Sequence, residues 1–212
     1  MDPVLARRPR KDTAVRREAI LRAATATFGN RGYTKGSLVE IAEQVGMTHA
    51  GVLHHFGSKD RLLLEVLEYR DQTDVAHLQG KHIPGGLDLF RHLVTTARLN
   101  SERPGIVQAF AVLSGESVTE DHPAKDFFRD RYAQLRLEVG DALREVCTPE
   151  DQPDDASIAA AAAGIIAVMD GLQVQWLLAP GEVDLAYNSA FAIEALLAAA
   201  VSGRQRTRWL EY

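Results

Sequence analysis

Residues 37–56 read SLVEIAEQVGMTHAGVLHHF, and this stretch decides how the chain folds. Ser37 is typical of a helix N-cap, and Glu40 three residues later completes a capping box, so a short helix is expected to start here. Gly46 is expected to end that helix, and Thr48 to cap a second short helix after it. Two capped short helices joined by a tight turn predict a helix-turn-helix, whose second helix can lie in the major groove of DNA.

Apolar residues on both sides of this motif recur at helical spacing. A first helix is expected over residues 13–28, with Ile20, Leu21, Ala24 and Phe28 on one face and Gly29 ending it. After the motif, Ser58 is expected to cap a fourth helix. Its apolar stripe would comprise Leu62, Leu63, Val66 and Leu67. The residues expected to pack the two motif helices are Ile41, Ala42, Val45, Val52 and Phe56.

The rest of the chain is also predicted to be helical, because alternating strand-like patterns are nearly absent. Glycine and proline turn signals divide it into several helices. Two alanine-rich helices, over residues 156–179 and 183–202, are expected to close the chain. The sequence therefore predicts an all-α protein of about nine helices.

The net charge of the chain is −5, which alone argues against a nucleic-acid-binding protein. The charge is unevenly spread, however. Residues 1–70 hold twelve Lys and Arg against eight Asp and Glu, so this part carries +4 and the remainder −9. A basic N-terminal part is sufficient for DNA binding, because only the surface that docks on the phosphates needs to be basic.

Cys147 is the only cysteine, so a disulfide within one chain is excluded and a cytoplasmic protein is expected. A redox role for this thiol stays open. Charged residues follow the basic N-terminus where a signal peptide needs an apolar core. The longest uncharged apolar run, residues 158–169, is too short to span a bilayer. We therefore expect no membrane partner.

Fixed residue types at fixed gaps give the N-terminal part a specific resemblance. The segments that carry it are residues 28–33 (FGNRGY), 41–42 (IA), 46–48 (GMT) and 55–62 (HFGSKDRL). Together they resemble the DNA-binding domain of the tetracycline-repressor (TetR) family, over about residues 13–67. The resemblance implies a helix-turn-helix DNA-binding domain at residues 1–68, followed by a helical domain at 69–212 that binds a ligand and forms a dimer.

The resemblance also implies which residues touch DNA. His49, Ala50 and Leu53 would face bases, while His54, His55 and Lys59 would approach phosphates. Chemistry agrees, since a histidine can donate to guanine and an apolar side chain can touch a thymine methyl group. Ser37 and Thr48 are further candidates, at the helix N-termini where phosphates bind. The basic arm of Arg7, Arg8, Arg10 and Lys11 is expected to be disordered in the free protein and to reach the minor groove or phosphates.

In the C-terminal domain, the resemblance implies a ligand pocket and a homodimer formed by the last two helices. Small residues at 159–164 and 192–200 permit the close helix approach of a four-helix bundle. The partners expected are a pseudo-palindromic DNA operator and a small-molecule effector, with no cofactor. Candidate pocket residues are Phe110, Phe128, Tyr132, Met169, Gln173 and Trp176.

The sequence disfavours some other functions and leaves others open. An enzyme is disfavoured, because no zinc-protease, phosphate-loop or serine-hydrolase motif occurs. A metal site at His49, His54 and His55 is disfavoured because these side chains point different ways around a helix. A ligand-binding module that no longer reads DNA stays open, since Gly51 and Leu53 lack hydroxyl groups usual for the family. Activation in place of repression also stays open.

Overall fold

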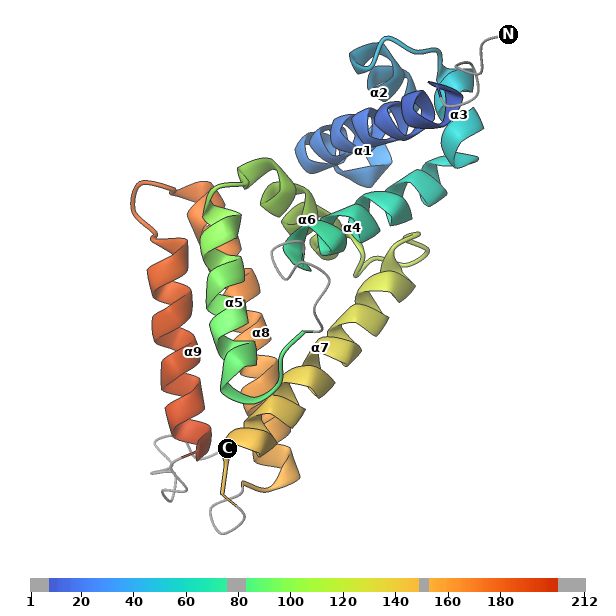
Figure 1. The fold of residues 1–212 in the computed structure, drawn as a ribbon. Coiled ribbons are helices and arrows are strands. Elements are labelled where there is room, and N and C mark those ends of the chain that lie inside the picture. Colours follow the sequence, from blue (N-terminus) through green and yellow to red (C-terminus); the bar gives the residue numbers. More distant parts are fainter. Residues whose placement is uncertain (1–7, 76–82, 149–152, 202–212) are drawn as a thin grey trace, which may run out of the picture. The chain divides into compact units, whose positions relative to one another are not determined.

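A computed structural model describes residues 8–75, 83–148 and 153–201, and every regular element in these ranges is an α-helix (Figure 1). The all-α prediction is confirmed. The helices are α1 (Arg8–Lys35), α2 (Leu38–Gln44), α3 (His49–Phe56), α4 (Lys59–Val75), α5 (Gly86–Ser101), α6 (Pro104–Glu116), α7 (Lys125–Val146), α8 (Asp155–Leu178) and α9 (Leu185–Val201).

The chain divides into two compact units. The first unit comprises Met1–Gly80 with Arg103–Arg129, and the second comprises Lys81–Glu102 with Asp130–Tyr212. The first unit thus holds α1 to α4, α6 and the start of α7. These units divide the chain by packing, whereas the predicted boundary after residue 68 divides it by function and stays a prediction.

The core of the first unit is the predicted one, except that Leu21 and Val45 are only half-buried. Ile20, Ala24 and Phe28 on α1 are fully buried, as are Ile41 on α2 and Val52 on α3. The predicted stripe of α4 is buried along its whole length: Leu62, Leu63, Val66 and Leu67. Burying a large aliphatic side chain contributes about 1.5–3 kcal/mol, so this stripe stabilises the packing of α4 in the first unit, where α4 contacts α1 and α3.

The predicted limits of α1 were wrong at both ends. The helix begins at Arg8, where Pro9 is tolerated because the first turn of a helix needs no N–H donor there. It also continues past Gly29. A Cβ at that position would lie 3.1 Å from the backbone nitrogen of Ala109, so Gly29 permits close packing against α6 and is not a cap. The helix breaks instead at Gly32, where φ is 69°.

The predicted caps of α3 and α4 are confirmed. Thr48 Oγ1 accepts a hydrogen bond from the N–H of Gly51 at 3.1 Å, and Ser58 Oγ accepts from the N–H of Arg61 at 3.1 Å. Gly46 ends α2 with a φ of 65°, a left-handed conformation that glycine adopts without strain. The tight geometry of the helix-turn-helix therefore follows from local sequence.

Only the serine half of the predicted capping box forms. Ser37 Oγ accepts from the N–H of Val39 at 3.2 Å, so it caps α2 as expected. The Glu40 carboxylate accepts instead from Arg31 Nε at 3.1 Å. This ion pair connects α2 to α1. It replaces the hydrogen bond that Glu40 was expected to form within α2 as part of the capping box.

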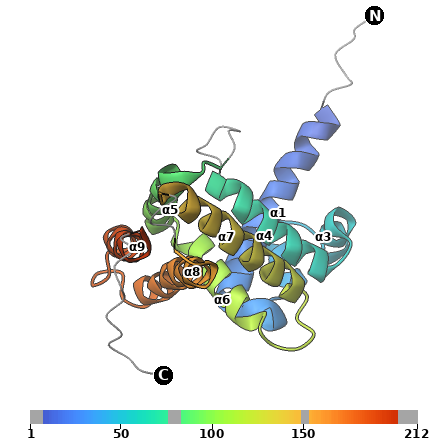
Figure 2. The ribbon, with the colours of Figure 1, turned by 90° about the horizontal axis from the view of Figure 1, so that it is seen from below.

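The second unit packs α5, α8 and α9 together with the later part of α7 (Figure 1). The view in Figure 2 looks nearly along α8 and α9, which lie side by side. The two helices begin and end within two residues of the predicted limits. The largest core side chains here are Leu89, Phe90, Leu143, Ile158, Ile165 and Ile193.

By length and composition alone, α8 could cross a membrane, which the uncharged run at 158–169 did not suggest. Only 28% of its most apolar window is buried within the chain. The same length and composition occur in core helices of soluble proteins. Here Ile158, Ala162 and Ile165 of α8 contribute to the core of the second unit.

Candidate nucleic-acid interface

Helix α3 turns one face outward, and five of the twelve predicted DNA contacts lie on it or at its N-cap. Thr48, His49, Ala50 and His54 are exposed, and Leu53 is half-buried. The opposite face is anchored by the side chains of Val52 and Phe56, which are buried. Ser37 is half-buried at the start of α2, and Lys59 is half-buried at the start of α4. The exposed face offers hydrogen-bond donors and small apolar groups to a base edge.

Arg17 on α1 holds α3 in place, and sequence reasoning missed it. Its Nη1 donates to the carbonyl of His55 at 2.5 Å, and its guanidinium lies 4.3 Å from the centre of the Phe56 ring. It also forms an ion pair with Glu65 on α4. The sequence did contain a signal for this role, because Arg17 lies three residues before the buried residue Ile20 and therefore on the same face of α1. One arginine therefore connects three helices of the DNA-binding region.

His55 is more enclosed than the other histidines of α3. Burial lowers the pKa of its imidazole, and the nearby positive groups of His54 and Arg17 lower it further. The ring is half-buried and lies against the ring of His54, at 5.9 Å between centroids. A neutral ring still has one N–H donor, so a phosphate contact remains available to it without a full positive charge.

Local packing explains why residue 51 is a glycine. A Cβ at this position would lie 3.2 Å from the terminal carbon of Met47 and 3.3 Å from Thr48 Oγ1. Any side chain would press on the residue that caps α3. The departure from the family pattern at Gly51 is therefore connected with the cap and does not by itself indicate lost DNA binding.

Lys59 has partners inside the first unit. Its ammonium group lies 4.4 Å from the centre of the Tyr33 ring and donates to the carbonyl of Thr34 at 3.3 Å. Burial lowers its pKa, and Asp60 and Glu116 partly offset this. Lys59 is therefore not an unpaired cation in the single chain. An ammonium group has three N–H donors, so a phosphate can still be bound.

The last turn of α1, after the break at Gly32, is bonded to the end of α6. The N–H of Tyr33 donates to the Glu116 carboxylate at 2.7 Å, and the Tyr33 hydroxyl donates to Asp60 at the start of α4. Burial, with the bond to Asp60, raises the pKa of Tyr33, so this hydroxyl stays protonated and remains a donor. The side chain of Glu116 would also be displaced by any Cβ at Gly32.

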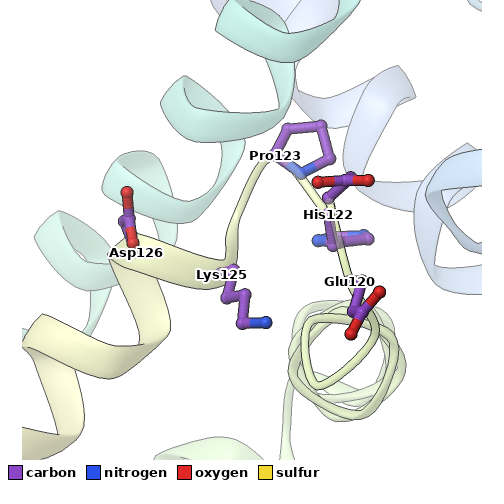
Figure 3. A pocket seen from close by; sticks show the side chains of 6 residues that line it. Glu120, His122, Pro123, Lys125 and Asp126 are labelled. Atoms are coloured by element: carbon purple, nitrogen blue, oxygen red, sulfur yellow. The ribbon is translucent and has the colours of Figure 1, made fainter.

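His122 lies in the loop between α6 and α7 (Figure 3), and its ring packs on the same turn. Its ring meets Tyr33 edge-on at 5.3 Å, and its Nδ1 accepts from the N–H of Ala124 at 3.2 Å. Its Nε2 is buried, 3.9 Å from the Glu116 carboxylate and beyond hydrogen-bond distance. Burial lowers the pKa of His122, and Glu116 offsets part of this. A neutral ring is therefore favoured.

Two family profiles match the chain. The profile described as bacterial regulatory proteins, tetR family, matches residues 20–66. A second, described as BetI-type transcriptional repressor, C-terminal, matches residues 91–206, more than half of the chain. The chain belongs to the TetR family. It is a helix-turn-helix transcriptional regulator and not an enzyme, which confirms the resemblance seen in residues 13–67.

TetR-family relatives match along nearly the whole chain. The probable regulator ArpR of Pseudomonas putida is 25% identical over 192 residues, covering 85% of this chain and 89% of ArpR. The regulator AcrR of Shigella flexneri is 24% identical, covering 91% and 93%. The structure of SmeT, described as the repressor of a Stenotrophomonas maltophilia multidrug efflux pump, has a TM-score of 0.68 at 21% identity, covering 94% and 95%.

The six candidate pocket residues of this TetR-family chain fall in both compact units. Phe110 and Phe128 belong to the first, where their rings meet edge-on at 5.1 Å and the Arg70 guanidinium lies 4.0 Å from the Phe110 ring. The others belong to the second. They are Tyr132, whose hydroxyl donates to Asp170 at 2.6 Å, half-buried Met169, and buried Gln173 and Trp176. Their role in ligand binding stays a prediction.

The predicted basic arm lies largely outside the described structure. Arg7 is outside the described residues, and so are the side chains of Arg8, Arg10 and Lys11. The backbone of residues 8–11 belongs to α1, so a disordered arm is not what the structure has at these three positions. Their contact with DNA stays a prediction.

Proposed function

We propose that this TetR-family regulator is a cytoplasmic repressor, which binds a pseudo-palindromic operator as a homodimer and leaves it when a small organic ligand binds residues 69–212. The outward face of α3 carries this proposal, because its capped N-terminus and exposed Thr48, His49 and Ala50 suit the major groove. The solved complex of SmeT with triclosan, with a TM-score of 0.66 at 20% identity, is consistent with a ligand-responsive fold.

Residues of α3 would divide base reading from phosphate binding. His49 would donate to a base, while Ala50 and Leu53 would contact thymine methyl groups. The phosphate contacts would come from the helix starts and the histidine pair. These residues are Ser37, Thr48, His54, His55 and Lys59. Arg7, Arg8, Arg10 and Lys11 would reach the minor groove or neighbouring phosphates.

Exposed apolar side chains on α8 and α9 support a dimer through these helices. Leu178 is 81% exposed, Tyr187 67% and Phe191 65% in the single chain. Large apolar groups exposed together indicate a partner surface. Exposed Ala163 on α8 adds the small side chains that let helices approach closely. A two-fold dimer would then place two copies of α3 on two half-sites.

The proposal predicts binding to promoter-proximal DNA of the protein's own locus, and release by a ligand. An effector found by thermal-shift screening should weaken operator binding about 5- to 150-fold, because allosteric coupling typically amounts to about 1–3 kcal/mol. Titration of the effector into the protein–operator complex, followed by fluorescence anisotropy, measures this. A tight ligand that leaves operator affinity unchanged would refute release. Failure to bind any DNA would favour the module that no longer reads DNA.

Two substitutions should separate the two kinds of contact. Lys59→Ala is expected to weaken binding to every sequence, whereas His49→Ala should change which base is preferred at one position. Each loss should be at most about 1–3 kcal/mol. Competition binding on the operator and on single-base variants measures both. Equal weakening by both substitutions on matched and scrambled DNA would contradict this division.

A further inference from the structure

The first unit contains a groove that none of the assigned roles uses. It has a volume of about 460 Å³ and lies where α1, α4 and the start of α6 meet. Small-molecule sites typically measure about 300–1,000 Å³, so its size suits a ligand of one or two rings. It is distinct from all six pocket residues predicted from sequence, because none of them lines it.

The walls of this groove are mainly apolar. Ala26 of α1, the ring of Tyr69 on α4, and Pro104 and Ile106 of α6 contribute them. The hydroxyl of Thr25 is not offered to the groove as a free donor, since it already donates to the carbonyl of Leu21 at 2.8 Å. The body of an occupant must therefore be apolar.

Gly105, at the start of α6, leaves part of the groove open. A Cβ at this position would meet nothing within 4 Å, and its φ is not positive. Neither packing nor backbone conformation therefore requires a glycine. A glycine without these reasons leaves room for a ligand to approach the backbone closely.

The described lining residues of the groove carry charge of one sign. Among its nine described lining residues, Arg22 and Arg103 are basic and none is acidic. The nearby Glu18 bonds Arg22 at 2.7 Å, but this pair is exposed to solvent and exposed pairs contribute little. Arg103 Nη1 donates to the carbonyl of Thr73 at 3.5 Å, which holds its guanidinium at the groove. Each guanidinium has five N–H donors, which suits a carboxylate.

We propose that this groove binds a small organic anion, an aromatic carboxylate whose ring lies against Tyr69 and Ile106 and whose carboxylate meets Arg22 and Arg103. The site is distinct from the six candidate effector-pocket residues, although part of its lining falls within residues 69–212. Its occupant would contact the three helices that carry and support α3, all within one compact unit.

Isothermal titration calorimetry on the full chain without DNA tests this, with 2-naphthoate as the probe and its neutral amide, 2-naphthamide, as the comparison. The naphthoate should bind with a dissociation constant below about 1 mM. The amide should bind about 10- to 100-fold more weakly, because it cannot form the charge-assisted hydrogen bonds. The double variant Arg22→Gln/Arg103→Gln should abolish the difference between the two probes.

A blocking variant separates this groove from any other site. Gly105→Leu should fill the groove and weaken naphthoate binding at least about tenfold, while Gly115→Leu should leave it unchanged. Gly115 is the matched control, because it lies on the same helix and a Cβ there also meets nothing within 4 Å. The thermal unfolding midpoint of each variant confirms that it is folded.

The proposal is overturned if naphthoate does not bind, if the amide binds equally well, or if Gly105→Leu binds naphthoate as the unsubstituted chain does. Binding that persists in Gly105→Leu would lie elsewhere in the protein. Since no DNA is present, none of these outcomes bears on operator binding, so failure here is distinguishable from failure of the proposed function.

Discussion

Raising the salt concentration from about 50 to about 200 mM is expected to weaken operator binding by about 10³- to 10⁵-fold, provided that the dimer neutralises about six to ten phosphates. The overall charge of −5 would suggest a weak response. The positive charge is concentrated in residues 1–70, however. One of these cations, Arg61, lies beside Gly57 at the end of α3, the helix proposed to read DNA. Each phosphate contact releases counterions, and this release is opposed by salt.

Fluorescence anisotropy across a series of KCl concentrations measures this slope. Lys59→Ala should reduce the slope by about one for each phosphate that the variant no longer binds. Arg91→Gln is the matched control, because Arg91 is an exposed cation on α5 already paired with Asp88 at 2.5 Å. A flat response, or an equal reduction by the control, would show that phosphates do not dominate affinity.

Introducing one carboxylate on the exposed face of α8 is expected to separate the dimer. Ala163→Glu would place a charge among small apolar groups where it has no partner, and an unpaired buried charge costs about 3–5 kcal/mol. That cost corresponds to a loss of about 10²- to 10³-fold or more in the dimer association constant. Operator affinity should fall with it, because both half-sites must be held at once.

Sedimentation velocity over a range of protein concentrations measures the association. Phe191→Glu on α9 should act in the same direction, since its ring is 65% exposed in the single chain. The control is Leu137→Glu on α7, where a side chain that is 62% exposed lies outside the proposed surface. If Ala163→Glu and Phe191→Glu both stay dimeric, or if Leu137→Glu dissociates equally, the dimer forms through another face.

Local signals made the DNA-reading motif predictable. Caps at Thr48 and Ser58, and the left-handed turn at Gly46, depend on residues within three positions of one another. The exposed face of α3 followed from helical periodicity, which brings His49 and Leu53 to one side. The limits of α8 and α9 were also predictable from local signals, because both helices are long, apolar and bounded by turn residues.

Contacts between distant residues could not be predicted in this way. Gly29 looked like a helix end, yet its meaning depends on Ala109, eighty residues away. The partner of Lys59 could not be predicted either, because its acceptor, the carbonyl of Thr34, lies in the last turn of α1, whose shape depends on Glu116. Arg17 was overlooked since only the folded chain brings Phe56 and Glu65 to it. Such long-range contacts cannot be inferred from the local pattern of a single sequence.

The close approach of Gly29 to Ala109 has a practical meaning for engineering. A chimaera that joins residues 1–68 to a foreign effector domain would remove α6 and leave the face of α1 that it covers without a partner. The transplantable cassette is discontinuous and includes residues 103–129 as well. A graft that includes both segments keeps the hydrogen bond from Tyr33 to Glu116. A graft of residues 1–68 alone lacks Glu116, the acceptor of that bond.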